Sequence, residues 1–420
     1  MKRSAALMGA LVLALGIGSG VSAQTPQLSD APFSTVTSKL EAAEDQAADR
    51  LIAIGGIPAP SGNEIARANA VVDLMREIGL VDVEVTDAPN VIGRIEGRSD
   101  RALIFVSTLD DLTTVAEHQA SRGRPPNRND RRIDGPGSNT SSTTVAMLMA
   151  AEALADSGFQ PEYDLVFAGV AQEETGLIGM RRLYERFKND AIAFVDVLGD
   201  GSTISYGALG IHWWRIEAKG PPGHTLRGGL PNVNVGIARA VDRIMAMPQP
   251  IEEGDRMTRA NVAILQSGAV FNHKPAEGWF SLDLRSLDAP TIAAMEDRTK
   301  AILAEVSKET GIDFQMEPEN IVPGGQIEGA LQSDLVRWSQ AIGEHLGLDP
   351  QMNDAGSANL NVAIADGTLA IGLGGERGGE RGLPEEWADL DAMTRAAQHI
   401  ALLAMTVGDA VPPPDTLSAE

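Results

Sequence analysis

The first half of the chain alternates between helical and strand-like patterns of hydrophobic and polar positions. Helical periodicity covers residues 33–54, and a second helix ends near Gly79. Short β-branched runs then alternate with helical stretches as far as residue 195, and alternation of this kind predicts a parallel α/β sheet. The predicted strands are 81–85, 91–95, 102–107, 165–170 and 191–195, and the predicted helices between them are 143–155 and 177–187.

The pattern changes at about residue 209, where strands and helices no longer alternate one by one. Two helices on one side of an antiparallel sheet would form an α+β arrangement. After about residue 326 the chain returns to the α/β style. The predicted strands are 213–218, 261–266, 279–285 and 369–373, and the predicted helices are 233–247, 290–310, 333–346 and 389–407.

These two patterns divide the mature chain into two domains. We expect an α/β domain built from residues 30–208 and 326–409, with an α+β domain of residues 209–325 inserted between them. A length of 420 residues with 43% hydrophobic residues supports a core of that size. The tail, 410–420, contains a run of prolines and is expected to be disordered.

The first 23 residues form a segment of their own. Lys2 and Arg3 precede an apolar run over 5–17, and small residues lead to Ala23. This order predicts a secretory signal peptide of residues 1–23 with cleavage after Ala23, and therefore a periplasmic or secreted protein. No later stretch reaches the ~20 apolar residues that a membrane span needs.

Charge and cysteine content restrict the partners and the kinds of metal site that the chain could have. The 34 Lys and Arg residues face 58 Asp and Glu residues, and the formal net charge of −24 argues against nucleic acid as a partner. The chain has no cysteine, so disulfides and thiolate metal sites are both excluded.

Two adjacent glutamates carry the strongest chemical signal. Glu173 and Glu174 follow the apolar run 165–170, and Gly176 opens the next predicted helix. Open parallel sheets bind ligands at the carboxyl ends of their strands, so one acid could point at a metal while its neighbour accepts a proton from a bound water. The alternative is a solvated helix start, which is a common role for adjacent glutamates in an acidic protein.

Several short segments occur in an order that points to one family. They are SGNE (61–64), STLDD (107–111), AQEETG (171–176), GPPGHTLRGGLPNVN (220–234), FNHKPAE (271–277), DLRS (283–286) and LPEEW (383–387). By their order and spacing the chain resembles the M-twenty peptidase family, which includes aminoacylases, tripeptide aminopeptidases, glutamate carboxypeptidases and succinyl-diaminopimelate desuccinylase. The resemblance covers nearly all of the mature chain. It implies a zinc-exopeptidase-like, three-layer catalytic domain of α/β class, an inserted α+β dimerisation domain and a homodimer.

The resemblance also implies a dinuclear zinc site, and three of its ligand positions are replaced in this chain. Family members hold two zinc ions with a bridging aspartate, and each ion takes one histidine and one further carboxylate. Thr108 stands at the first histidine position and Gly382 at the last. Thr140 stands at the bridging aspartate, or Asn139 does so in an alternative alignment.

Two carboxylates remain at ligand positions, Glu174 for one ion and Asp200 for the other. A catalytic zinc ordinarily takes about three protein ligands, so these two would hold zinc only weakly. Without the ion, the water beside Glu173 keeps nearly its bulk pKa and the attacking hydroxide is lost. We therefore expect no cofactor, or zinc only in a residual or rearranged site, and a raised pKa for Glu173 or Glu174 because their charges repel.

The other matched residues point to binding. His224 matches a histidine that, in the family, reaches from the inserted domain into a partner subunit and stabilises the tetrahedral intermediate; on its own it would be a surface residue. Asn272 and Arg285 match positions near the substrate-carboxylate pocket, although an ion pair with Asp283 explains Arg285 equally well. Asp110 belongs behind the missing first histidine, and the favoured alternative is a strand-end acid that caps backbone amides.

Two other chemistries stay open. A rearranged mononuclear site could use polar residues of the same segments, although His118 lies in a polar stretch that we expect to be a mobile loop. A hydroxyl nucleophile lacks an obviously placed histidine, and a helix N-cap explains the serine and threonine run 138–144. The residues open to a rearranged site are Asp111, Glu117, His118, Asn139 and Asn359, and the hydroxyl candidates are Thr140, Ser141 and Ser142.

Three functions therefore compete. The first is a pseudoenzyme that binds a small peptide or acylated amino acid without turnover. The second is an active hydrolase of a peptide or amide bond with an altered metal site or none. The third is a protein-interaction module that uses the inserted domain. Loss at three separate ligand positions favours the first function.

Overall fold

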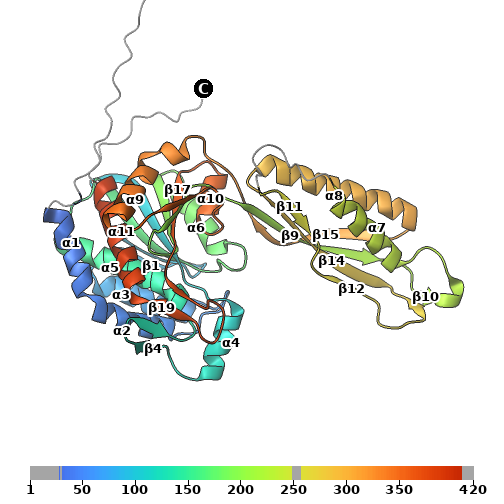
Figure 1. Ribbon diagram of the computed structural model, residues 1–420, viewed down its shortest axis with the longest axis horizontal. Helices are drawn as coiled ribbons and strands as arrows, with labels where there is room; N and C mark the ends of the chain where they lie inside the picture. Colours follow the sequence, from blue (N-terminus) through green and yellow to red (C-terminus); the bar gives the residue numbers. More distant parts are fainter. Residues whose placement is uncertain (1–27, 29–30, 248–256, 409–420) are drawn as a thin grey trace, which may run out of the picture.

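The computed structural model describes residue 28, residues 31–247 and residues 257–408. It contains a broad α/β domain and an inserted α+β domain that extends to one side (Figure 1). The predicted signal peptide and the predicted disordered tail lie outside the described residues. None of the helices in the described ranges is long and apolar enough to cross a membrane.

The α/β domain is built on an eight-stranded sheet. In spatial order its strands are β1 (Val81–Val85), β2 (Val91–Ile95), β6 (Tyr163–Val170), β3 (Ser99–Thr108), β7 (Ala191–Val197), β17 (Ala370–Gly374), β8 (Thr203–Ser205) and β16 (Gln351–Asn353). The central strands β6, β3, β7 and β17 are parallel, but β2 is antiparallel to β6 and β8 is antiparallel to β17. The prediction of a parallel sheet is therefore correct for the centre and wrong toward the edges.

Helices cover both faces of this sheet (Figure 1). In β3, Leu103 and Phe105 pack into one apolar core while Ile104 and Val106 pack into the other, because successive side chains of a strand point to opposite faces. A strand buried on both faces reads as a continuous apolar run, which is why the sequence predicts it well. One helical layer holds α1 (Ala31–Ala42), α2 (Glu44–Gly55), α3 (Ile65–Glu77), α5 (Ser138–Ser157), α9 (Asp334–His345) and α11 (Leu390–Gly408), and the other holds α6 (Ile178–Phe187) and α10 (Leu360–Ala365).

The inserted domain packs two helices on a five-stranded antiparallel sheet. Its elements are β9 (Gly210–Lys219), α7 (Val233–Met245), β11 (Arg259–Asn261), β12 (Leu265–Ser267), β14 (Glu277–Ser286), α8 (Ala289–Thr310) and β15 (Asp313–Val322). Ile237 of α7 and Leu303 of α8 belong to a core separate from those of the α/β domain. The predicted strand 261–266 is two short strands. The strand β15 escapes prediction because half of its residues are polar and none of them is buried. The chain enters and leaves this domain where Ala208 and Gly325 exchange backbone hydrogen bonds of 2.9 and 3.0 Å.

A helix and a small sheet replace the mobile loop predicted around His118. The polar stretch is ordered by Gln119, whose buried side-chain amide donates to the carbonyls of Gly55 and Pro136 at 2.6 and 3.1 Å. The loop prediction is therefore wrong for 113–122. The elements are α4 (Thr113–Arg122) and a four-stranded sheet of β18 (Gly378–Gly379), β19 (Trp387–Asp389), β5 (Arg132–Asp134) and β4 (Asn127–Asn129). The remaining short elements are β10 (Gly223–His224), η1 (Thr225–Arg227), β13 (His273–Lys274) and η2 (Ala330–Gln332).

A buried ion pair fixes the segment that follows β3. Arg67 of α3 donates to the Asp111 carboxylate at 2.6 Å, and both side chains are almost fully buried. The same guanidinium donates to the carbonyls of Ile57 and Leu109 at 2.6 to 3.1 Å. Buried charges are tolerated when their hydrogen-bonding groups are satisfied in this way, so Arg67 ties α3 to the chain that carries the candidate site.

We predict that Arg67→Met lowers the free energy of unfolding by about 3–5 kcal/mol, because it leaves the Asp111 charge buried without a partner. Urea unfolding measures the change. Arg76→Met is the matched control: Arg76 lies on the same helix, its side chain is exposed and its pair with Asp73 is 3.3 Å long, so the loss should stay within about 1 kcal/mol. Equal losses for the two variants would contradict the role given to Arg67.

Candidate functional site

A cavity of about 250 Å³ opens at the carboxyl ends of the parallel strands. It lies where β3, β6, β7 and β17 end and where α5 begins, the place at which open α/β sheets bind ligands. Thr108, Thr140 and Glu173 line it together, although they are distant in the sequence. The other lining residues are Leu198, Ser357, Ala358, Gly374, Gly375, Arg377 and Arg381.

Asp110 holds the turn that carries the two glutamates. The backbone N–H of Glu173 donates to Asp110 Oδ1 at 2.9 Å, and that of Glu174 donates to Oδ2 at 3.1 Å. Both oxygens of this buried carboxylate are thus used by backbone amides, which is the capping role considered from the sequence. Burial raises the pKa of Asp110 to about 6.

The carboxyl group of Glu173 lines the cavity and holds its proton more tightly than an ordinary glutamate does. Burial raises the pKa of Glu173 to about 8, and the negative charges of Glu174, Asp110 and Asp196 add to the rise. The predicted increase is confirmed, but desolvation is its first cause and repulsion by Glu174 its second. The Glu173 carboxyl is therefore mostly protonated at neutral pH.

Asp196 is a site residue that the sequence patterns do not single out. Asn359 Nδ2 donates both to Asp196 Oδ1 at 3.2 Å and to Thr108 Oγ1 at 3.1 Å, and the Leu360 amide donates to Asp196 Oδ2 at 3.0 Å. Burial raises the pKa of Asp196 to about 7. The sequence feature that could have identified Asp196 is an acid inside the apolar strand AIAFVDV. Buried strands rarely keep a carboxylate that has neither a partner nor a functional role.

Asp200, predicted as a residual metal ligand, points into the protein instead. Its Oδ1 accepts hydrogen bonds from the amide and hydroxyl of Ser202 at 3.0 and 2.7 Å and from the Glu376 amide at 3.1 Å. Its Oδ2 accepts two bonds of 3.1 Å from Arg395. The prediction of a ligand role is wrong because these donors use both oxygens. Asp200 holds the turn after β17, from which Arg377 reaches the cavity.

Two arginines absent from the sequence predictions stand beside the glutamates. Both follow β17 in the repeated stretch GGERGGER, and both line the cavity. Arg381 forms an ion pair with Glu174. The Arg377 carbonyl accepts the Asp389 amide at 3.1 Å, but its guanidinium group makes no hydrogen bond or ion pair with any residue in the described ranges. The glycines of this stretch are the sequence feature that could have indicated a tight turn at the site. Gly375 has φ +109°, and a Cβ there would lie 1.9 Å from Ser202 Oγ.

Gly382, predicted as the replaced last histidine, does not line the cavity. A Cβ at this position would point to Leu112 Cδ1 at 3.3 Å and Thr114 Oγ1 at 3.8 Å. The φ of +84° would also strain any side chain placed there. Arg381 is the residue of this turn whose side chain reaches the candidate site.

Glu386 caps the start of α5 in place of the helix's own hydroxyl groups. Its Oε1 accepts from the amides of Gly137 and Asn139, both at 3.1 Å. The serine and threonine run 138–144 lies inside the helix, so the N-cap expected from this run is wrong. The Asn139 side chain turns away to a backbone carbonyl at 3.0 Å, and Thr140 lines the cavity.

The predicted site residues of the inserted domain do not reach the cavity within one chain. His224 and Asn272 meet near β10, with Asn272 Nδ2 3.3 Å from His224 Nε2, and Figure 1 places β10 at the end far from the α/β domain. Both side chains are exposed. Arg285 lies toward the other end of β14 and donates to Asp283 at 3.0 to 3.2 Å, as the ion-pair alternative expected.

The residues considered for a rearranged metal site are dispersed or already bonded. Asp111 is bound by Arg67, and Asn359 donates to Asp196. Glu117 and His118 lie on α4 and are not among the residues that line the cavity. These candidates therefore do not converge on one point.

The donors around the cavity do not fit a zinc ion. Within the described ranges no group of three histidine, cysteine or acidic side chains could hold a metal. Glu174 is paired with Arg381, and Asp196 is bonded from both sides. The lining offers threonine and serine hydroxyls but no histidine, whereas zinc sites take most of their affinity from histidine and cysteine. A hydroxyl nucleophile would likewise lack an activating histidine.

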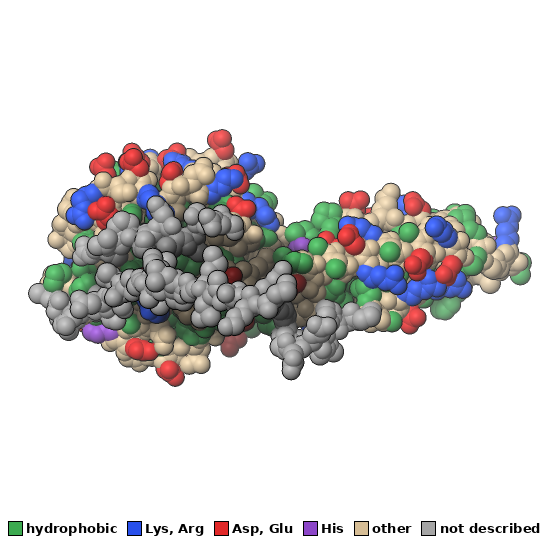
Figure 2. Space-filling model, turned by 90° about the horizontal axis from the view of Figure 1, so that it is seen from above, with side chains coloured by type: hydrophobic (Ala, Val, Ile, Leu, Met, Phe, Trp, Pro, Cys, Tyr) green, Lys and Arg blue, Asp and Glu red, His purple; other side chains and the backbone are tan. Residues whose placement is uncertain are grey.

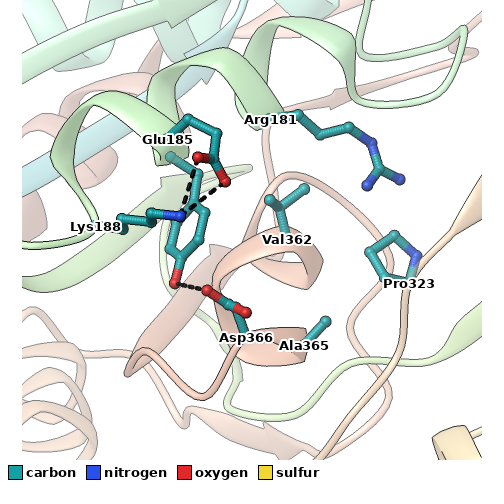
Figure 3. A pocket seen from close by; sticks show the side chains of 8 residues that line it. Arg181, Glu185, Lys188, Pro323, Val362, Ala365 and Asp366 are labelled. Carbon is teal, nitrogen blue, oxygen red and sulfur yellow. Dashed lines mark hydrogen bonds and ion pairs between the residues drawn. The ribbon is translucent and has the colours of Figure 1, made fainter.

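A larger hollow, of about 380 Å³, lies on the face covered by α6 and α10 (Figure 3). Its polar groups are satisfied: Lys188 pairs with Glu185 at 3.0 Å, and the Tyr184 hydroxyl donates to Asp366 at 2.8 Å. Arg181 donates to a backbone carbonyl at 2.8 Å. Size alone therefore does not identify the functional site, and the chemistry lies in the smaller cavity.

We predict that the stability of the protein falls as the pH rises from about 4.5 to about 8, and that Glu173→Gln removes part of this slope. Between these values the folded chain keeps a proton on Glu173 that the unfolded chain has released, so rising pH favours unfolding. Urea unfolding across this range tests the prediction, with the exposed Glu385→Gln as control. Parallel pH profiles for wild type and Glu173→Gln would contradict the raised pKa.

We predict that zinc binding is restored better through position 381 than through position 382. The variant Thr108→His, Thr140→Asp, Arg381→His releases Glu174 and places the new imidazole where the arginine reaches the site. Its matched control carries Gly382→His and keeps Arg381. Chelator competition should give a zinc affinity at least about tenfold higher for the first variant, which is ~1.4 kcal/mol. Equal or reversed affinities would contradict the placement of Arg381.

Comparison with known proteins identifies the family of this chain. Residues 111–406 match the model of Peptidase family M20/M25/M40. Carboxypeptidase G2 of a Pseudomonas species is 21% identical over 328 residues, which cover 76% of this chain and 77% of that protein.

Solved structures share the fold over nearly their whole length. The aminopeptidase PepT of Bacillus cereus has a TM-score of 0.72 at 17% identity, covering 87% of this chain and 98% of that chain. The YXEP protein of Bacillus subtilis, described as a dinuclear metal binding peptidase, has a TM-score of 0.65 at 15% identity, covering 88% of this chain and 100% of that chain. With a mixed α/β domain, an inserted domain and a family match over most of its length, the chain belongs to the M-twenty peptidase family.

Proposed function

We propose that this chain is a non-catalytic member of its family that binds a small peptide or acylated amino acid. One observation carries the proposal: the Glu174 carboxylate, expected at a metal-ligand position, is paired with Arg381. The names of its relatives, a carboxypeptidase and an aminopeptidase, suggest peptides as the ligand class. A cavity at the carboxyl ends of the strands supports binding.

The residues of the cavity are suited to hold a ligand rather than to cleave it. Glu173 is mostly protonated at neutral pH and can donate a hydrogen bond to a carbonyl or carboxylate oxygen. Thr140 and Ser357 bring hydroxyl groups that can donate or accept. Activation of water to a hydroxide would need a metal or a general base, and no metal-competent donor set supports Glu173 in that task.

An active hydrolase with an altered site is the second candidate. The observation that favours it is the Glu173 pKa of about 8, because a general base works best when its pKa lies near the operating pH. In that case Glu173 would take a proton directly from the attacking water. The partner groups that would stabilise the resulting oxyanion are the arginines of the cavity.

A homodimer and export from the cytoplasm belong to the same proposal. Leu226 and Phe271 are almost fully exposed beside His224, and Figure 2 shows hydrophobic side chains among charges of both signs on the inserted domain. A partner that covers this region would bury them and would bring His224 towards a second chain. Export rests on the predicted signal peptide alone.

We predict that the purified protein carries far less than one zinc per chain and shows no chelator-sensitive hydrolysis of peptides or acylated amino acids. Elemental analysis measures the metal, and a hydrolysis panel with and without chelator measures activity. An active zinc peptidase of the family serves as positive control for the panel. Stoichiometric zinc together with hydrolysis that the chelator abolishes would refute the non-catalytic function.

A further inference from the structure

The strongest unexplained feature of the cavity is an arginine without a partner. Arg377 lines the cavity and is half-buried, yet its guanidinium group makes no hydrogen bond or ion pair with any residue that the structure describes. Arg381, four residues later, is paired with Glu174. Taking a guanidinium charge partly out of water without a partner is unfavourable, so a charge of opposite sign is the natural complement of Arg377.

The turn that presents Arg377 is fixed by several contacts. Asp200 accepts the amide of Glu376 at 3.1 Å, and the Glu376 carbonyl accepts the Asp200 amide at 3.0 Å. Arg395 holds Asp200 from the other side through two bonds of 3.1 Å. Gly375 and Gly378 take φ values of +109° and +130°, at which a side chain would collide with neighbouring atoms. Arg377 is thus placed by a rigid loop, as a ligand-binding group should be.

Two acids near Arg377 already have partners of their own. Glu174 is paired with Arg381, and Asp196 accepts hydrogen bonds from Asn359 at 3.2 Å and from the Leu360 amide at 3.0 Å. Burial and the nearby Arg381 lower the pKa of Arg377 to about 10, which still leaves its guanidinium charged. The group that the cavity lacks is therefore an anion rather than a cation.

We propose that Arg377 anchors the carboxylate of a small ligand, which binds in this cavity without a metal ion. A guanidinium matches a carboxylate through two parallel N–H···O bonds. The hydroxyls of Thr140 and Ser357 line the same cavity and can donate to the remaining lone pairs. A volume of about 250 Å³ is below that of pockets for drug-sized molecules and suits a ligand of one acylated residue.

This inference deepens the proposed function, since it names the group by which the same cavity recognises its ligand. It assigns the carboxylate to the α/β domain. Neither Asn272 nor Arg285, the residues expected from the resemblance to lie near a substrate carboxylate, lines this cavity.

Calorimetric titration of the full protein with N-acetylglycine and with its uncharged analogue N-acetylglycinamide tests the proposal. Wild type should bind the acid at millimolar concentrations and bind the amide at least about tenfold more weakly, since a charge-assisted pair is worth ~1.5–3 kcal/mol. Arg377→Gln should remove this preference. Arg377→Lys should retain part of it, because an ammonium keeps the charge but not the bidentate geometry.

Arg337→Gln is the matched control, since Arg337 lies exposed on α9. This variant should bind the acid and the amide as wild type does. If wild type binds the acid and the amide with equal affinity, the proposal is wrong, and this result needs no variant. If Arg377→Gln still binds the acid as wild type does, the proposal is wrong as well. Binding of inorganic phosphate but of no carboxylate overturns the choice of ligand class. If the protein hydrolyses a substrate and still binds carboxylates through Arg377, the non-catalytic function is wrong but the role of Arg377 is supported.

Discussion

A carboxylate that faces a cavity needs a positive charge or a proton, and the candidate site is organised around this requirement. An ionised carboxyl group that leaves water is stable only when a cation lies close to it or when several N–H groups donate to its oxygens. The ion pair between Arg381 and Glu174 meets the need at one glutamate. Glu173 meets it by keeping its proton, because burial raises its pKa to about 8. Two adjacent acids can therefore persist at the end of β6 without zinc.

Three other acids near the cavity accept hydrogen bonds from backbone amides and so hold the turns around it. Asp110 holds the amides of the glutamate turn, Asp200 holds the turn of Arg377, and Glu386 caps α5. Each carboxylate is buried and accepts several N–H bonds, so each fixes one wall of the cavity. This arrangement explains how the fold of a metallopeptidase family can be kept while the donor set for a metal is not.

The sequence predicts the fold better than it predicts the site. Helices and central strands show strong apolar periodicity and were predictable. By contrast, β15 mixes polar and apolar residues without burying any of them, and α4 is mostly polar, so both depend on tertiary contacts. Motif spacing correctly brought Thr108, Thr140 and Glu173 to one cavity. Asp196 and Asp200 lie in one segment, and only the direction of each side chain decides which one faces the site. That direction cannot be read from spacing alone.

In the proposed non-catalytic function, protein guanidinium groups take the place of metal ions beside the glutamate pair. The most direct test is a crystal structure of wild-type protein soaked in zinc, with anomalous scattering recorded at the zinc edge. We expect no zinc peak in the cavity and an Arg381 side chain that remains on Glu174. A zinc peak bound by Glu174, with Arg381 displaced towards solvent, would contradict it.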